Sequence, residues 1–259
     1  MWASRIVHEC CLHEHDHGNS YITLTYDDDH LPVWDSLHHK HFQDFMKRLR
    51  HHVKHRVRFY MCGEYGREKD GTLGRPHYHA ILFNQSFSKD DVFDVNNDIP
   101  SYTNQFLTEL WPKGIAVHND VTYNAAAYVA GYVRKKVTGI KADDHYSRVD
   151  PNTGEWNSIT PEYSTMSRRP GIGRGWYDRY QTDFFPKDQT PVPGYGTYNG
   201  APRYYLEMLE QRNPELHEEV KKNREKFMQE NKHDYTPERL MDRYKVRKAQ
   251  TSQLKRPLE

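Results

Sequence analysis

Residues 74–84, GRPHYHAILFN, decide how this sequence is interpreted, because they combine a strand pattern with two closely spaced histidines. The segment from His77 to Phe83 is rich in apolar and aromatic residues and predicts a β-strand. Successive side chains of a strand point to opposite faces, so His77 and His79 share one face while Tyr78 lies on the other. Two imidazoles on one face make a pair of metal ligands, although an H-x-H pair alone is more often two partly exposed strand histidines.

A carboxylate precedes this pair at a useful distance. Residues 57–62, VRFYMC, predict another strand, and the glycine-rich residues 63–76 predict the loop that joins the two strands into an antiparallel pair. Glu64 leaves the end of the first strand, and the hairpin brings it beside His77 and His79. The expected metal site has two imidazoles and one carboxylate, with open positions for phosphate oxygens and water.

Other periodic segments indicate an α+β fold with a central antiparallel sheet flanked by helices. SYITLTY, residues 20–26, predicts a strand, and apolar residues at helical spacing from Leu37 to Val53 predict an amphipathic helix that packs on the sheet. A polar loop is expected before residue 103. The further expected elements are helices at 3–15, 103–110 and 121–137 and a short strand at 114–118.

The second half of the chain has a different character. Residues 141–175 predict a loop containing a hairpin with TGEW at its turn, and the proline- and glycine-rich PVPGYGTYNGAP, residues 191–202, predicts a linker. We therefore expect a domain over residues 1–188, followed by a linker and a charged helical C-terminal region over 189–259. Its three expected helices cover residues 202–211, 214–231 and 236–251.

Composition excludes some classes of protein and leaves function open. No run of about 18 apolar residues exists, and the N-terminus lacks the apolar core of a secretory signal, so we expect an intracellular protein with no membrane partner. Cys10 and Cys11 are adjacent and only Cys62 remains, which favours a reducing compartment. The formal net charge of +1 does not by itself indicate a nucleic-acid partner.

Tyrosines at helical spacing follow the histidines. Tyr128, Tyr132 and Lys136 are separated by four residues each, so a helix over 121–137 would place them on one stripe. A phenol is a poor nucleophile near its free pKa of about 10, but a metal can polarise a phosphate and a lysine can favour the phenolate. Tyrosines at this spacing are more often core-facing aromatics, so the stripe gains weight only beside the histidines.

Taken in order, these segments resemble a known family. YITLTYDDDHLP, CGEYG, GRPHYHAILFN and AAYVAGYVRKK are similar to the motifs of the HUH superfamily of rolling-circle replication initiators, most of all those of gokushovirus-type microviruses, which are small single-stranded DNA bacteriophages. EYSTMSRRPGIGRGWYDRY resembles a stretch that follows the tyrosine motif in that group. The resemblance covers roughly residues 1–185. Relatives carry a cysteine-rich segment before the first helix, so a truncated start is left open.

The resemblance implies an RRM-like or ferredoxin-like palm fold and a role for each motif. His77, His79 and Glu64 would bind Mg²⁺ or Mn²⁺, Tyr128 and Tyr132 would be the two nucleophiles, and Lys136 would sit at the phosphate. The implied reaction is site-specific nicking and rejoining of single-stranded DNA through a 5′-phosphotyrosine link. The implied partners are the viral origin and host helicase and polymerase in the bacterial cytoplasm.

Phosphate contacts and alternatives complete the sequence-based hypothesis. We expect DNA contacts from local cations, with Tyr163 or Trp176 available for base stacking. The expected cations are Arg134, Lys135, Arg168, Arg169 and Arg174. One alternative is a transposase or plasmid mobilisation nickase of the same superfamily. Another is a non-catalytic nucleic-acid-binding module of RRM type, although no K/R-G-F/Y-type signature occurs.

Overall fold

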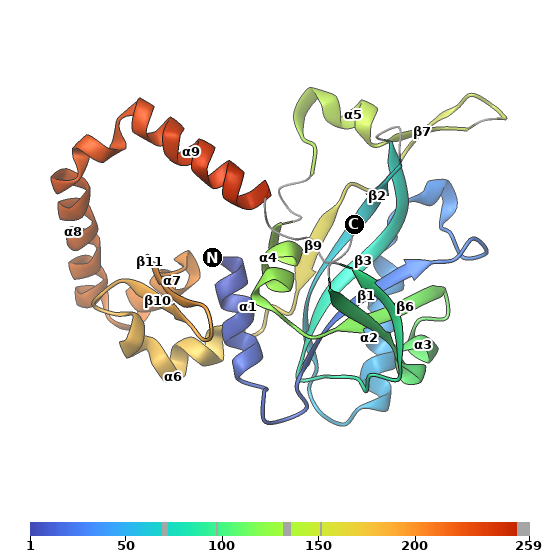
Figure 1. Cartoon of the computed structure of the whole chain (residues 1–259), viewed down its shortest axis with the longest axis horizontal. Coiled ribbons are helices and arrows are strands. Elements are labelled where there is room, and N and C mark those ends of the chain that lie inside the picture. Colours follow the sequence, from blue (N-terminus) through green and yellow to red (C-terminus); the bar gives the residue numbers. More distant parts are fainter. Residues whose placement is uncertain (69–71, 97, 132–135, 151, 253–259) are drawn as a thin grey trace.

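The computed structural model describes residues 1–68, 72–96, 98–131, 136–150 and 152–252 (Figure 1). Its centre is a seven-stranded sheet of order β4-β5-β6-β1-β3-β2-β9, in which every neighbouring pair is antiparallel. The strands are β1 (Asn19–Tyr26), β2 (Arg58–Arg67), β3 (Leu73–Phe83), β4 (Asp91–Asn96), β5 (Ile99–Thr103), β6 (Gly114–Asn119) and β9 (Tyr163–Met166). The predicted α+β class and antiparallel sheet are confirmed.

Helices cover both faces of the sheet, as the alternation of apolar side chains requires. One face packs against α2 (His39–His52) and α3 (Gln105–Leu110). The other packs against α1 (Trp2–Cys11) and α4 (Tyr123–Gly131). The buried residues of the first face include Leu24, Tyr26, Phe45, Tyr78 and Trp111, and those of the second include Ile6, Tyr21, Tyr60, Ala126 and Val129.

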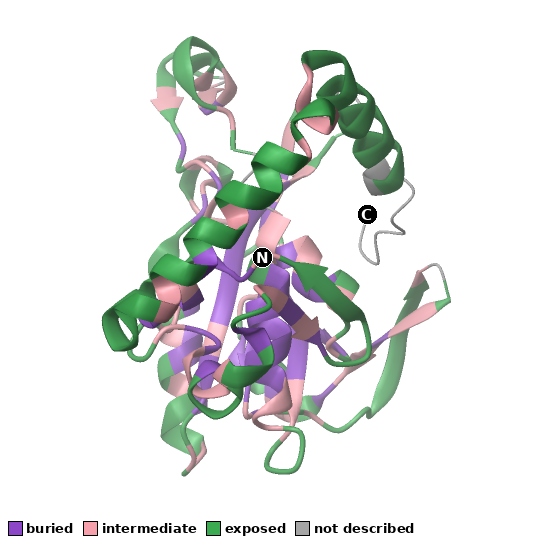
Figure 2. Ribbon diagram, turned by 90° about the vertical axis from the view of Figure 1, so that its left-hand side faces the viewer, coloured by how far each residue is buried: buried purple, intermediate pink, exposed green. Residues whose placement is uncertain are grey.

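A separate apolar cluster lies beside α1, on the side away from the sheet. It joins α6 (Arg174–Phe184), α7 (Arg203–Arg212) and α8 (Pro214–Glu230) through buried residues such as Phe184 and Tyr205. His8 of α1 connects to this cluster, since its Nδ1 lies 2.9 Å from the Tyr205 hydroxyl and its Nε2 lies 2.7 Å from the Pro191 carbonyl oxygen. The last helix, α9 (Pro237–Ser252), is largely exposed (Figure 2).

Several expected boundaries are confirmed. The C-terminal helices, the strands at 20–26 and 114–118 and the TGEW hairpin all form, the last as β7 (Ser147–Val149) and β8 (Trp156–Ser158). The division at residue 188 stays a prediction. Short helices not mentioned above are α5 (Ala142–His145) and the 3₁₀ segments Val33–Asp35, Gly139–Lys141 and Lys232–Tyr235. No helix in the described ranges is both long and apolar enough to cross a bilayer.

Other expectations were wrong. The loop at 63–76 is largely strand, because β2 extends to Arg67 and β3 begins at Leu73, and the polar loop before residue 103 holds β4 and β5. The expected linker forms the hairpin of β10 (Gln189–Val192) and β11 (Gly196–Asn199), and the loop at 141–175 gives β9 and the start of α6. In each case backbone pairing or packing overrides a composition typical of loops.

Candidate metal centre

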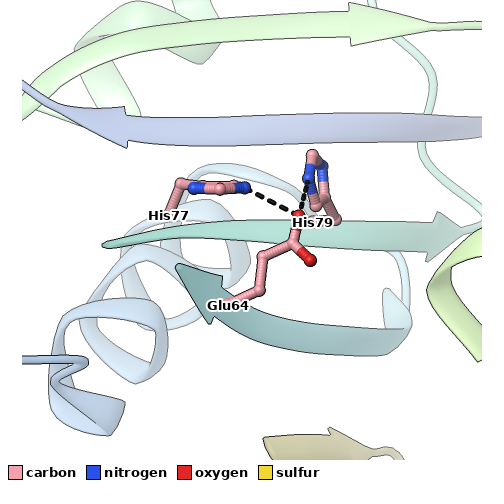
Figure 3. Close-up of side chains that lie close together, drawn as sticks. All are labelled: Glu64, His77 and His79. Carbon is pink, nitrogen blue, oxygen red and sulfur yellow. Dashed lines mark hydrogen bonds and ion pairs between the residues drawn. The ribbon is translucent and has the colours of Figure 1, made fainter. Parts of the chain in front are cut away.

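Glu64, His77 and His79 meet on one face of the β2–β3 hairpin. Glu64 pairs with His77 across the two strands, and Cys62 pairs with His79, so all three functional side chains project from the same side. The Glu64 Oε1 atom lies 2.7 Å from His77 Nε2 and 2.8 Å from His79 Nε2 (Figure 3). The structure therefore brings together the three side chains that the sequence proposed as ligands.

The other nitrogen of each ring is held by a polar neighbour. His77 Nδ1 lies 3.1 Å from the Arg75 carbonyl oxygen, which can only accept a hydrogen bond. His79 Nδ1 lies 2.9 Å from Thr23 Oγ1 and 2.8 Å from the Tyr21 hydroxyl. An imidazole that donates from Nδ1 keeps the Nε2 lone pair for a cation, and such outer contacts fix the tautomer and orientation of metal-binding histidines.

Burial concentrates the charge of this site. Glu64 is 4% exposed and His79 is 1% exposed, whereas His77 is only half-buried. Burial opposes ionisation of Glu64, but the hydrogen bonds and charges of His77 and His79 outweigh it and lower the pKa of Glu64 to about 2. A buried carboxylate that stays ionised between two imidazoles is an arrangement in which a cation replaces protons as the counter-charge.

The distances fit a small divalent cation. The ligand atoms of the three residues all lie within 4.8 Å of one another, and theirs is the only such group of histidine, cysteine and acidic side chains in the described ranges. Adjacent ligands of an octahedral ion with bonds of about 2.1 Å are about 3 Å apart, close to the contacts of Glu64 with the two rings. Two imidazoles and one carboxylate leave coordination positions for phosphate and water.

Tyr128 of α4 reaches the same centre. Its hydroxyl donates toward Glu64 Oε1 at 3.5 Å, the outer limit of a hydrogen bond, and its ring meets the ring of His79 edge-on with centroids 5.4 Å apart. Tyr128 is only partly buried, while its neighbours Ala126 and Val129 anchor α4 to the sheet. A phenol oxygen thus lies beside the candidate ligands on a helix whose apolar face fixes its position.

Comparison with known proteins agrees with these motifs. Residues 19–137 match a family described as replication-associated protein ORF2. The chain is 30% identical over 82% of its length to the replication-associated protein VP4 of Bdellovibrio phage phiMH2K, and 30% identical over 74% to the replication-associated protein ORF4 of Chlamydia phage 1. The chain belongs to the family of phage replication-associated proteins. The matched segment of this family member holds the metal centre and Tyr128.

The relatives are longer than this family member. The aligned regions span 64% of the Bdellovibrio phage protein and 46% of the Chlamydia phage protein. The replication-associated protein ORF2 of Spiroplasma virus 4 is 27% identical over 67% of the chain, and 52% of its own length is covered. No solved structure matches the chain.

The expected tyrosine stripe is only partly placed. Tyr132, Arg134 and Lys135 lie outside the described residues. The expectation that the helix continues to Val137 was wrong: α4 is described to Gly131, and residues 136–138 are not helical. The Val137 backbone N–H instead donates to the Tyr146 hydroxyl at 2.9 Å. Lys136 is exposed and does not continue the helix of Tyr128.

The expected DNA contacts are not gathered at the metal centre. Arg168 and Arg169 follow β9 and lie beside the first residues of β2. Arg174 is on α6, where its Nε lies 3.0 Å from an Asp178 carboxylate oxygen. The two aromatic candidates are already packed, since Tyr163 stacks on His39 and Trp176 stacks on His8.

The residues that hold His79 were missed by the sequence interpretation. Tyr21 and Thr23 lie on β1, and Thr23 is directly opposite His79 in the register of the β1–β3 pair. Burial raises the pKa of Tyr21 well above its usual value, so this hydroxyl stays protonated. The available signal was the two-residue period of SYITLTY, which places Tyr21 and Thr23 on one face together.

Proposed function

We propose that this protein initiates phage DNA replication by nicking and rejoining single-stranded DNA at a specific site, with Tyr128 as a nucleophile. The observation that carries the proposal is the convergence of the Tyr128 hydroxyl with Glu64, His77 and His79. Similarity to replication-associated proteins supports the replication role and gives no support to a transposase or a mobilisation enzyme.

The protein's own residues would orient the reacting groups. Thr23, Tyr21 and the Arg75 carbonyl hold the two imidazoles, and the contact with Glu64 holds the Tyr128 hydroxyl at the edge of the centre. This preorganisation matters because positioning of a nucleophile and a phosphate supplies a large part of such rate enhancements. When bound at Glu64, His77 and His79, a divalent cation would polarise the phosphate and stabilise charge on the attacking oxygen.

The bonds exchanged in the proposed step are balanced. The phenol loses its proton to water, the bond between the Tyr128 oxygen and phosphorus forms, and the bond between phosphorus and the 3′ oxygen breaks. The 3′ oxygen takes up a proton, which leaves a 5′-phosphotyrosine link and a free 3′-hydroxyl. Because the phosphodiester energy stays in the link, attack by a 3′-hydroxyl rejoins the strand without ATP.

The proposed cofactor is Mg²⁺ or Mn²⁺. Both ions accept a mixed set of oxygen and nitrogen ligands while keeping exchangeable positions for phosphate, although Zn²⁺ would also accept two imidazoles. Tyr132 is proposed as the second nucleophile, with Lys136 as a phosphate contact. The proposed partners are single-stranded DNA at the viral origin and host helicase and polymerase, in the cytoplasm of the bacterial host.

The test uses labelled single-stranded fragments of the surrounding phage genome with Mn²⁺. The unmodified protein should form a covalent adduct that migrates slowly in a denaturing gel. Tyr128→Phe together with Tyr132→Phe should abolish the adduct, because no phenol remains at the centre. Tyr123→Phe is the matched control, since Tyr123 lies on the same helix and packs against Tyr195 and Tyr198 instead.

The proposal is wrong if the adduct survives loss of both Tyr128 and Tyr132 hydroxyls. It is also wrong if the unmodified protein cleaves no fragment with any divalent cation. In that second case, retained binding to the same fragments would revive the non-catalytic nucleic-acid-binding module.

A further inference from the structure

A basic groove lies at the end of the sheet remote from the metal centre. It has a volume of about 700 Å³ and is formed by the segment from Arg50 to Phe59 on one side and residues 167–169 on the other. Six of its lining residues are cationic and none is acidic. They are Arg50, Lys54, Arg56, Arg58, Arg168 and Arg169.

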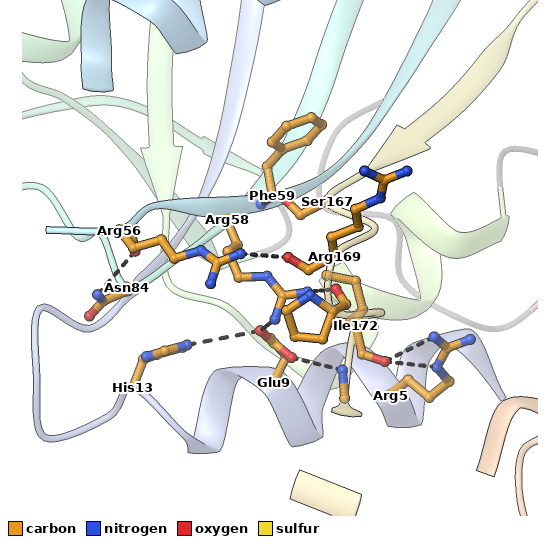
Figure 4. Close-up of polar contacts among 12 residues, drawn as sticks. Arg5, Glu9, His13, Arg56, Arg58, Phe59, Asn84, Ser167, Arg169 and Ile172 are labelled. Atoms are coloured by element: carbon orange, nitrogen blue, oxygen red, sulfur yellow. Dashed lines mark hydrogen bonds and ion pairs between the residues drawn. The ribbon is translucent and has the colours of Figure 1, made fainter. Parts of the chain in front are cut away.

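The two sides of the groove are tied together by hydrogen bonds (Figure 4). The Ser167 backbone N–H donates to the Phe59 carbonyl at 2.9 Å, and the Phe59 N–H donates to Ser167 Oγ at 3.1 Å. Arg58 donates to the Pro170 carbonyl and to the buried Glu9 carboxylate. Glu9 also accepts from the Gly173 N–H at 2.7 Å. The shape of the groove is therefore fixed by contacts that do not use its exposed side chains.

The exposed cations of the groove have no acidic partner in the described part of the chain. Lys54, Arg56, Arg168 and Arg169 are exposed, and no ion pair with a carboxylate is formed by any of them there. Arg56 donates only to the Arg169 carbonyl. Burial and the charge of Arg56 both lower the pKa of Arg50. Like charges held this close repel one another, and a bound polyanion relieves that repulsion.

The distance from the metal centre suggests which part of the DNA would lie here. Arg58 and Glu64 are six positions apart on β2, so the groove is about 20 Å from the centre at roughly 3.3 Å per strand residue. With about 3.4 Å per nucleotide of a stacked strand, this corresponds to roughly six nucleotides. The groove is too far away to contact the phosphate that is cut.

We propose that this groove binds the phosphodiester backbone of the DNA that flanks the nick, as a site separate from the metal centre. The inference rests on the proposed function for the identity of the DNA. The groove would supply affinity that depends on charge and not on sequence, because phosphate contacts by arginine and lysine carry no base information. It would hold the flanking strand while the metal centre cuts and rejoins it.

The test measures binding of fluorescein-labelled oligo(dT) of about 30 nucleotides in EDTA, where no cleavage can occur. Lys54→Gln combined with Arg168→Gln and Arg169→Gln should weaken binding by about tenfold or more, and should reduce the slope of log affinity against log salt by about 2. The matched control is Arg179→Gln with Lys222→Gln and Lys232→Gln, which removes the same charge from positions outside the groove. The control should bind as the unmodified protein does.

Two further variants separate charge from shape and this site from the nicking site. Exchange of the three groove cations for the other basic residue, Lys54→Arg with Arg168→Lys and Arg169→Lys, should restore the salt slope. His77→Ala with His79→Ala should leave the groove-dependent part of binding intact. Equal affinities of the groove and control variants would overturn the proposal. Because no cleavage is measured, this outcome is independent of whether the protein nicks DNA.

Discussion

Strand β2 carries Glu64 toward one end and Arg58 at the other, and their surroundings differ in charge, burial and partners. Around Glu64, a buried carboxylate and two imidazoles converge within hydrogen-bonding distance and leave room for one cation and one phosphate. Around Arg58, exposed cations border an open groove with no acidic side chain in its lining. The first arrangement suits a chemical step and the second suits affinity, so substitutions at the two ends should affect different measurements.

The largest effect is expected at the metal centre. His77→Ala with His79→Ala removes both nitrogen ligands, and nicking should fall by roughly a thousandfold or more because metal stabilisation of a phosphate is worth several kcal/mol. Oligo(dT) binding in EDTA should change little. The control is His30→Ala, an exposed histidine that contacts Asp27. Nicking at the normal rate without both imidazoles would remove the metal centre from the mechanism.

The next effect concerns the buried pair that supports the groove. Arg58→Met should reduce the free energy of unfolding by about 3 to 5 kcal/mol, because it leaves the Glu9 carboxylate buried without its cation. Urea denaturation measures this loss. Arg56→Met removes an exposed arginine from the same groove and should cost less than about 1 kcal/mol. Equal stability of the two variants would show that the Glu9–Arg58 pair does not support this end of the sheet.

A third effect concerns the attachment of the C-terminal cluster to α1. Burial lowers the pKa of His8 from 6.5 to about 4, against a smaller opposing effect of the Pro191 carbonyl. The unfolded chain therefore binds a proton that the folded protein excludes, so stability should fall by about 3 kcal/mol as the pH drops from 6.5 to 4. Denaturation across this range should show the loss, and His8→Phe should flatten it. An unchanged pH dependence in His8→Phe would contradict the assignment.

The smallest effect is expected from the residues behind His79. Thr23→Val and Tyr21→Phe remove hydroxyl groups that orient the ring, and each should weaken Mn²⁺ binding by about 10- to 100-fold. Calorimetric titration with Mn²⁺ measures the change. Thr25→Val is the matched control on the same strand, because Thr25 lies opposite His77 and not His79. Unchanged Mn²⁺ affinity in both Thr23→Val and Tyr21→Phe would show that these hydroxyls do not position the ligand.

The metal centre was predictable from sequence because its geometry is local. The two-residue strand period places His77 and His79 together, and the hairpin pairs His77 with Glu64. The extent of that hairpin was not predictable, since the glycine-rich run from Gly63 to Gly74 resembles a loop and forms strand through backbone pairing. Strand β4 is almost entirely exposed, so no burial pattern announced it.

The basic groove was beyond sequence reasoning for a different reason. Arg168 and Arg169 were expected to contact DNA, but their position depends on the pairing of β9 with β2, more than 100 residues earlier in the chain. That pairing places them beside Lys54 and Arg56 and away from the histidines. Likewise, the hairpin over residues 189–199 has the proline and glycine content of a linker, and only its packing beside α1 reveals it as structure.

The most direct test of the account is to map the DNA adduct by mass spectrometry. Single-stranded phage DNA should be incubated with the protein and Mn²⁺ and then digested with nuclease and protease. The account predicts a nucleotide attached through its 5′-phosphate to Tyr128 or Tyr132, and attachment at Tyr132 alone in Tyr128→Phe. An adduct on any other residue, or one joined through a 3′-phosphate, would contradict the central claim that this phenol and this metal centre act together.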